Sequence, residues 1–155
     1  MSEPIRVRMA DYIVTNNSGI LITTVGSCVA IGVYDGKGVG GLAHIILPEH
    51  DGRSELKGKF ADTAIPAMIR DMKHMEADIS NMRAKIAGGA QMFNFPSFSF
   101  SIGERNIQKV REVLRENGIR IVGEDVGENY GRTVEFYTST GKMIVRRSDR
   151  ILREL

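Results

Sequence analysis

The chain has 155 residues and a formal net charge of +2, with 42% hydrophobic and 26% charged residues. This size and composition are typical of a soluble globular protein, and we expect one domain over residues 1–155. The small net charge and the absence of tryptophan argue against a surface that binds nucleic acid through phosphate contacts or base stacking.

Strand patterns dominate the first third of the chain. Short apolar runs rich in β-branched residues alternate with turn residues such as Asn16-Asn17-Ser18-Gly19 and Asp35-Gly36-Lys37-Gly38. We expect strands at Val7–Val14, Ile20–Val25, Val29–Tyr34 and Gly40–Leu47. The stretch Tyr12–Tyr34 has no charged side chain and is long enough to cross a bilayer, but its polar and glycine residues favour strands over membrane insertion.

The rest of the chain combines helices and strands. A polar loop over 49–59 precedes a helical pattern with one apolar face, for which Asp62 is the expected N-cap. A second helix is expected over Asn106–Glu116, ended by Gly118 at C′. Further strands are expected at Arg83–Ala87, Ile119–Gly123, Val134–Tyr137 and Met143–Arg146. Because strands outnumber helices, we predict an α+β fold, a layered sandwich of mixed and antiparallel sheets flanked by two main helices.

Cys28 and His44 lie on the two strands of the predicted hairpin. A loop of Asp35–Lys37 would place them directly opposite each other, and a loop of Asp35–Val39 would place them diagonally on the same face. The corresponding Cβ separations are about 4.5–5.5 Å and about 7–8 Å. A loop with an even number of residues would put the two side chains on opposite faces.

Such a pair has a chemical use. A free thiol with a pKa of about 8.5 is only about 3% thiolate at pH 7. A neighbouring imidazole can take the thiol proton, leaving a thiolate–imidazolium pair, and the imidazolium can then protonate a departing amine. Gly26 and Ser27 precede the thiol, and a tight turn there is suited to direct backbone N–H groups at an oxyanion.

The same residues have simpler interpretations. A single cysteine at a strand start is commonly a small buried hydrophobe, and a histidine among apolar residues is commonly a core residue. One cysteine excludes an internal disulfide and a cysteine-rich zinc site. A metal site of Cys28, His44 and His50 has no recognisable ligand spacing, so we expect no metal. The lone thiol and the lack of a signal-peptide pattern favour a cytoplasmic location.

The sequence around both residues resembles a known family. The blocks that carry the likeness follow in order along nearly the whole chain, at 25–30, 40–48, 59–64, 84–90, 102–106, 131–134 and 140–142. The first two read Val-Gly-Ser-Cys-Val-Ala and Gly-Gly-Leu-Ala-His-Ile-Ile-Leu-Pro. Together these blocks closely resemble the CheD family of chemoreceptor glutamine deamidases.

The resemblance implies a Cys-His-Thr triad with Cys28 as nucleophile and His44 as base. Thr23 and Thr24 compete for the third place, and Thr23 is preferred because Gly19–Ile22 aligns naturally up to it. Its role would be to orient His44. The resemblance also implies a fold similar to toxin-type cysteine deamidase domains, with no cofactor.

The expected partners are the cytoplasmic helices of chemotaxis receptors and a CheC-type phosphatase, without membrane insertion. The alternatives are a protein that serves mainly as binding partner of the phosphatase, a receptor glutamyl methylesterase using the same thioester, and a redox-sensing thiol.

Three further segments have structural interpretations. Gly88-Gly89-Ala90 is expected to let the backbone pass close to another segment, and Asn106 to hydrogen-bond a loop. Gln91–Phe100 is expected to be partly core and partly an exposed docking loop.

Overall fold

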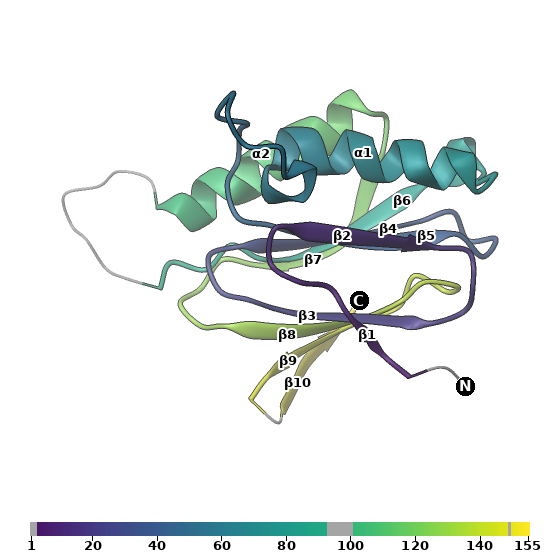
Figure 1. Ribbon diagram of the computed structural model, residues 1–155. Coiled ribbons are helices and arrows are strands. Elements are labelled where there is room, and N and C mark those ends of the chain that lie inside the picture. The colour runs from purple at the N-terminus through teal and green to yellow at the C-terminus, as the bar shows by residue number, and fades with distance from the viewer. Residues whose placement is uncertain (1–2, 93–100, 149) are drawn as a thin grey trace.

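A computed structural model describes residues 3–92, 101–148 and 150–155 of the chain. The strands form two five-stranded sheets (Figure 1). Sheet A consists, in spatial order, of β1 (Ile5–Arg6), β3 (Ile20–Val25), β8 (Arg132–Tyr137), β9 (Met143–Arg147) and β10 (Arg150–Glu154). Sheet B consists of β2 (Asp11–Thr15), β5 (Gly40–Ile45), β4 (Val29–Tyr34), β6 (Arg83–Gly88) and β7 (Arg120–Val126).

The elements form three layers (Figure 1). Helices α1 (Ala61–His74) and α2 (Ile102–Glu116) cover one face of sheet B, and sheet A lies against its other face. Two 3-10 turns, η1 (Lys57–Lys59) and η2 (Ile79–Asn81), lie before and after α1 in the chain. Each sheet is mixed, because β1–β3 and β6–β7 are parallel and the other pairings are antiparallel. The predicted α+β sandwich with two main helices is confirmed.

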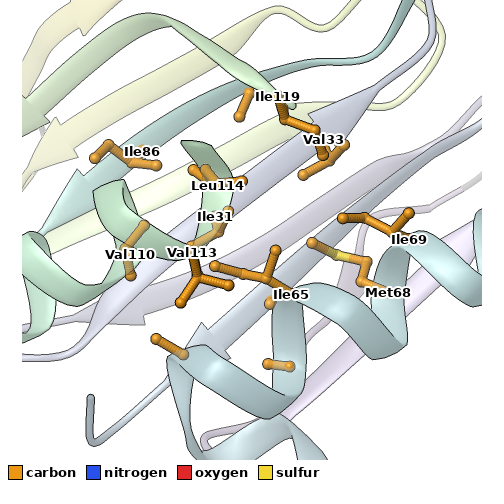
Figure 2. Close-up of a cluster of buried hydrophobic side chains, with 14 of the residues drawn as sticks. Ile31, Val33, Ile65, Met68, Ile69, Ile86, Val110, Val113, Leu114 and Ile119 are labelled. Carbon is orange, nitrogen blue, oxygen red and sulfur yellow. The ribbon is translucent and has the colours of Figure 1, made fainter. Parts of the chain in front are cut away.

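The larger apolar core lies between the helices and sheet B (Figure 2). Alternate residues of β4 point into it, and α1 and α2 add the apolar faces that their helical spacing predicts. The labelled members are Ile31, Val33, Ile65, Met68, Ile69, Ile86, Val110, Val113, Leu114 and Ile119. Every residue of β4 and β5 is buried, which explains why these strands are apolar on both faces.

A second apolar cluster fills the space between the two sheets. It contains Ala30 and Leu42 from sheet B and, from sheet A, Leu21, Val25, Val134, Phe136, Met143 and Val145. Gly32 leaves room for the Phe136 ring, since a Cβ at Gly32 would lie 2.7 Å from a ring carbon. Cys28 packs against this cluster, so the thiol belongs to the layer between the sheets.

The first predicted strand, Val7–Val14, is wrong. The chain forms two strands there, β1 in sheet A and β2 in sheet B, and it crosses between the sheets at residues 7–10. Ala10 has φ 64°, a left-handed conformation that ends an extended strand. The crossing is fixed at both ends, since Val7 N donates to Ile22 O and Ala10 N donates to His44 O.

The helix starts also differ from expectation. The N-cap position of α1 is Phe60, without a side-chain cap, while Asp62 lies in the first turn and accepts a hydrogen bond from His50 N. Helix α2 begins four residues before Asn106, where Ser101 caps it by accepting from Glu104 N at 3.1 Å. The predicted C′ residue Gly118 is confirmed, with φ 72°.

All seven strands predicted within residues 20–147 are confirmed, two with the predicted ends and the others with ends shifted by one to three residues. Strand β10 was not predicted, because its fully exposed sequence Arg-Ile-Leu-Arg-Glu lacks the alternation of a half-buried strand. Residues 12–34 form most of β2, all of β3 and β4 and the turns between them, and the described part of the chain contains no helix long and apolar enough to cross a membrane. Most of the expected docking loop Gln91–Phe100 lies outside the described residues.

Candidate active site

The β4–β5 hairpin sets the relation between the thiol and the imidazole. Ala30 pairs with His44 and Val29 with Ile45, so the hairpin closes through the longer of the two expected loops, Asp35–Val39. Cys28 lies in the bend just before β4, diagonal to His44. Both side chains lie on the side of sheet B that faces sheet A. Ala30, the cross-strand partner of His44, belongs to the apolar cluster between the sheets, and Cys28 packs against that cluster.

One buried carboxylate stabilises the Asp35–Val39 loop. Asp35 is 1% exposed, and its Oδ1 accepts from Lys37 N at 2.8 Å and from Val39 N at 3.0 Å. Its Oδ2 accepts from Asp78 N at 3.0 Å. The carboxylate therefore replaces the pairing that a shorter turn would supply from the backbone.

The imidazole of His44 is buried and held by a threonine. Thr23, on the inner face of β3, is 1% exposed, and its Oγ1 lies 2.7 Å from His44 Nδ1. Thr24 points to the opposite, exposed face, where its Oγ1 lies 3.3 Å from Thr133 Oγ1. Of the two competing threonines, Thr23 is the one that the fold brings to the imidazole.

The hydrogen count at Thr23 determines the tautomer of the ring. Thr23 Oγ1 donates to Val7 O at 2.9 Å, and a hydroxyl has a single hydrogen to donate. Its contact with His44 must therefore be one in which Nδ1–H donates to Oγ1. In the neutral ring, Nε2 then carries the lone pair, and this buried atom has no hydrogen-bond partner among the described residues. The free basic nitrogen is thus Nε2.

Burial shifts both titrations in the direction of uncharged groups. It raises the pKa of the Cys28 thiol, against a smaller opposing effect of the residue's own backbone N–H, and it lowers the pKa of His44. Both directions favour a neutral thiol beside a neutral imidazole at rest. The expected thiolate–imidazolium pair is therefore not the resting state that burial favours, and the proton would move as the reaction proceeds.

The bend that carries Cys28 is held by close backbone contacts with the end of β6. Gly89 N donates to Cys28 O at 2.8 Å, and Ala90 N donates to Gly26 O at 3.0 Å. A Cβ at Gly88, whose φ is 114°, would lie 2.3 Å from Cys28 O. The expected close backbone approach of this glycine segment is confirmed. With both carbonyls bound, the peptide units around Ser27 have a fixed orientation.

A buried ion pair, which sequence reasoning did not single out, is connected to the Gly88 segment. Arg132, 1% exposed, lies on β8, and its Nη2 is 3.1 Å from Asp125 Oδ1 on β7. Arg132 Nη1 also donates to Gly127 O, and Gly127 N donates to Gly88 O. The pair therefore connects sheet A to the segment that supports Cys28. Two charges of opposite sign seven residues apart give no sequence signal of such a contact.

The other two histidines lie outside this arrangement. His50 and His74 are exposed, and His50 Nε2 lies 2.8 Å from Ser54 O. Within the described ranges, no three His, Cys, Asp or Glu side chains are grouped so that they could hold a metal ion.

Comparison with known proteins places this chain in a family. The family model described as "CheD chemotactic sensory transduction" matches residues 46–147. The chain is also 40% identical over 143 residues to the "Chemoreceptor glutamine deamidase CheD" of Thermotoga maritima, covering 91% of this chain and 90% of that protein. The chain belongs to the CheD family.

Other CheD relatives are as similar over similar lengths. The "Probable chemoreceptor glutamine deamidase CheD" of Caldanaerobacter subterraneus subsp. tengcongensis is 47% identical, covering 94% of this chain and 93% of that protein. The protein of the same description from Haloarcula marismortui is 44% identical, covering 93% and 85%. Among solved structures, the Bacillus licheniformis hypothetical protein YfiH matches with a TM-score of 0.46 and 16% identity. That match covers 72% of this chain and 49% of that one.

Proposed function

We propose that this CheD protein is a chemoreceptor glutamine deamidase, an amide hydrolase with Cys28 as nucleophile, His44 as base and Thr23 as the residue that orients the base. The CheD relatives named as deamidases support the reaction. The observation that carries the residue assignment is the chain of contacts from Val7 O through Thr23 to His44, which leaves Nε2 as a free basic nitrogen.

The first half-reaction forms a thioester. His44 Nε2 takes the Cys28 proton as Sγ attacks the side-chain carbonyl carbon of a receptor glutamine. The resulting oxyanion accepts hydrogen bonds from backbone N–H groups of the Gly26–Ser27 bend, whose orientation is fixed by the Gly89 and Ala90 contacts. Nε2–H then protonates the nitrogen, the C–N bond breaks and ammonia leaves.

The second half-reaction returns the enzyme to its starting state. His44 Nε2 takes a proton from water, and the hydroxide attacks the thioester carbon. The C–S bond breaks, Sγ recovers its proton from Nε2–H, and glutamate is released. Throughout, Thr23 Oγ1 accepts from Nδ1–H, which strengthens when the ring is charged. No cofactor enters any step.

The setting follows from the reaction. The substrate would be glutamine on the cytoplasmic helices of a chemotaxis receptor, so the protein would act in the cytoplasm. Each edit adds one negative charge to a helical bundle and thereby shifts its packing equilibrium. A CheC-type phosphatase is the second partner that we propose, on the basis of the family resemblance.

Mass spectrometry of receptor cytoplasmic fragments tests the function. Incubation with the wild-type chain should give glutamate at specific glutamine positions with release of ammonia, and Cys28→Ala should give neither. A fragment carrying glutamyl methyl esters in place of glutamine measures esterase activity in the same assay. Turnover by folded Cys28→Ala, or no amide hydrolysis by the wild-type chain, would reject the assignment.

A further inference from the structure

The second turn of α2 places a polar side chain behind the candidate site. Asn106 is fully buried, and its Nδ2 donates both hydrogens to backbone carbonyls. One acceptor is Ser27 O at 3.0 Å, immediately before Cys28. The other is Ile46 O at 2.9 Å, two residues after His44. One amide therefore joins the backbone segment of the nucleophile to that of the base, and the expectation that Asn106 hydrogen-bonds a loop is confirmed.

These two carbonyls lie where the sheet itself stops. The β4–β5 ladder runs from Tyr34↔Gly40 to Val29↔Ile45, so Cys28 and Ile46 lie one step beyond its last pair. Leu47 N, which the same register would pair with Ser27 O, donates instead to Lys59 O at 3.1 Å, so the two strands separate at this point. The Asn106 amide takes the place of the next rung by binding both chains at once.

Two further hydrogen bonds to the Cys28 bend come from the β6 side of the sheet. The bonds from Gly89 N and Ala90 N attach the bend to the segment after β6, which carries neither the thiol nor the imidazole. They fix the bend relative to sheet B on one side but leave its separation from the end of β5 undetermined. Asn106 supplies that second constraint, and two non-parallel attachments are needed to fix the position of a loop.

The remaining atom of the amide shows the cost of this arrangement. Asn106 Oδ1 is buried and has no hydrogen-bond partner among the described residues. A buried unpaired acceptor is unfavourable, and a leucine of similar size would fill the same space without leaving a polar atom unpaired. A polar side chain is needed here for its two N–H groups.

We propose that Asn106 is a positioning residue that holds Cys28 in reacting register with His44; this inference rests on the proposed function for its catalytic consequence. Asn106 touches neither substrate nor reacting atoms and acts through the two backbone segments it joins. Its loss should lower kcat, because a displacement of about 1 Å can cost about 10²-fold in rate. KM should stay within about twofold, because the substrate contacts are unchanged.

A double-mutant cycle on thiol reactivity tests the inference without any receptor substrate. Cys28 is the single cysteine of the chain, so the rate of alkylation by iodoacetamide at pH 7 reports on it alone. His44→Ala should slow alkylation of the otherwise wild-type chain by about tenfold, because the thiol loses its base. In the Asn106→Leu background the same His44 substitution should change the rate by less than about twofold, because the pair is already out of register.

The matched control is Asn81→Ala. Asn81 also donates its Nδ2 to a backbone carbonyl in a part-buried hydrogen bond, Asp35 O at 2.7 Å, but at the far end of the β4–β5 hairpin. This variant should keep the full tenfold effect of His44→Ala. Circular dichroism confirms that each variant is folded. If Asn106→Leu does not fold, Asn106→Ser, which keeps one donor in a smaller side chain, should show a reduced but measurable coupling.

The outcomes separate the two proposals. A full His44 effect in folded Asn106→Leu or Asn106→Ser overturns the positioning role and leaves the proposed function standing. Loss of coupling in Asn106→Leu, or reduced coupling in Asn106→Ser, together with no amide hydrolysis by the wild-type chain, supports the positioning role and rejects the deamidase assignment. If His44→Ala leaves alkylation unchanged in the wild-type background, the dyad does not exist and both proposals fail.

Discussion

At the scale of single residues, the site depends on how one hydroxyl uses its one hydrogen. Thr23 donates to Val7 O and must therefore accept from His44 Nδ1, which fixes the ring tautomer and leaves Nε2 as the free basic nitrogen. The neighbouring Thr24 has the same chemistry but lies on the exposed face of β3. Adjacent residues of a strand point to opposite faces, so two neighbouring threonines can be compared, one in contact with His44 and one without that contact.

Thr23→Val should lower kcat/KM for receptor glutamine by about 10- to 100-fold. The valine cannot accept from Nδ1–H, and a hydrogen bond to a charged group contributes about 1.5–3 kcal/mol, or roughly one to two factors of ten in rate. Thr24→Val should leave kcat/KM within about twofold. Steady-state ammonia release measures both, and equal effects of the two substitutions would show that the Thr23 contact is unimportant.

The pH dependence of kcat/KM follows from burial of the same pair. His44 must be neutral to accept the thiol proton, and burial lowers its pKa, so the ring stays neutral to a lower pH than an ordinary histidine. The acidic limb of the profile should therefore have its midpoint below the ordinary histidine pKa. Burial raises the pKa of Cys28, so the alkaline limb should lie above that of an exposed thiol. An acidic midpoint above the ordinary histidine value contradicts this account.

At the scale of elements, the β4–β5 hairpin places the thiol and the imidazole on one face because its loop has an odd number of residues. Asp35 stabilises this loop by accepting three backbone N–H groups from a fully buried position. A loop of even length would turn His44 away from the layer between the sheets. The register of the site thus depends on a carboxylate far from the chemistry.

Asp35→Ala should reduce the free energy of unfolding by about 2 kcal/mol or more, because three N–H groups lose a charged acceptor and at least one of them is buried. Asp51→Ala is the control: Asp51 accepts from Arg53 N and Ser54 N in an exposed loop, where water can replace it. That change should cost much less. Urea denaturation followed by circular dichroism compares the two, and similar losses would contradict the role assigned to Asp35.

At the scale of the whole molecule, the candidate site lies between two sheets and depends on both. Sheet B supplies Cys28 and His44, while sheet A supplies Thr23 and, through the crossing after β1, the Val7 carbonyl. Arg132 and Asp125 join the sheets near the Cys28 bend with a buried ion pair. The relative position of the sheets is therefore part of the site.

Asp125→Ala should destabilise the fold by about 3–5 kcal/mol, because it leaves the buried Arg132 guanidinium without a carboxylate. Arg153 also approaches Asp125, at 3.6 Å, but its side chain is 66% exposed. Arg153→Ala should cost no more than about 1 kcal/mol. Chemical denaturation of both variants measures the difference, and an equal cost would show that burial of the pair is energetically irrelevant.

The sequence by itself determined the features that local patterns encode. β-Branched runs gave the strands at Ile20–Val25 and Val29–Tyr34, turn residues gave the hairpin, and ordered motif blocks gave the CheD family. Hairpin arithmetic related the loop length to the placement of Cys28 and His44, directly opposed, diagonal on one face or on opposite faces, and only the observed register decided for the diagonal arrangement. Each of these depends on residues near one another in the chain.

Only the tertiary structure decided how distant segments meet. The contacts of Thr23 with Val7 and His44 span 16 and 21 residues, and those of Asn106 with Ile46 and Ser27 span 60 and 79. The split of the first expected strand between two sheets has the same origin, since only the finished layers show that the chain must cross at Ala10. Propensity and periodicity describe a segment's own conformation, whereas these contacts depend on how sheets and helices pack.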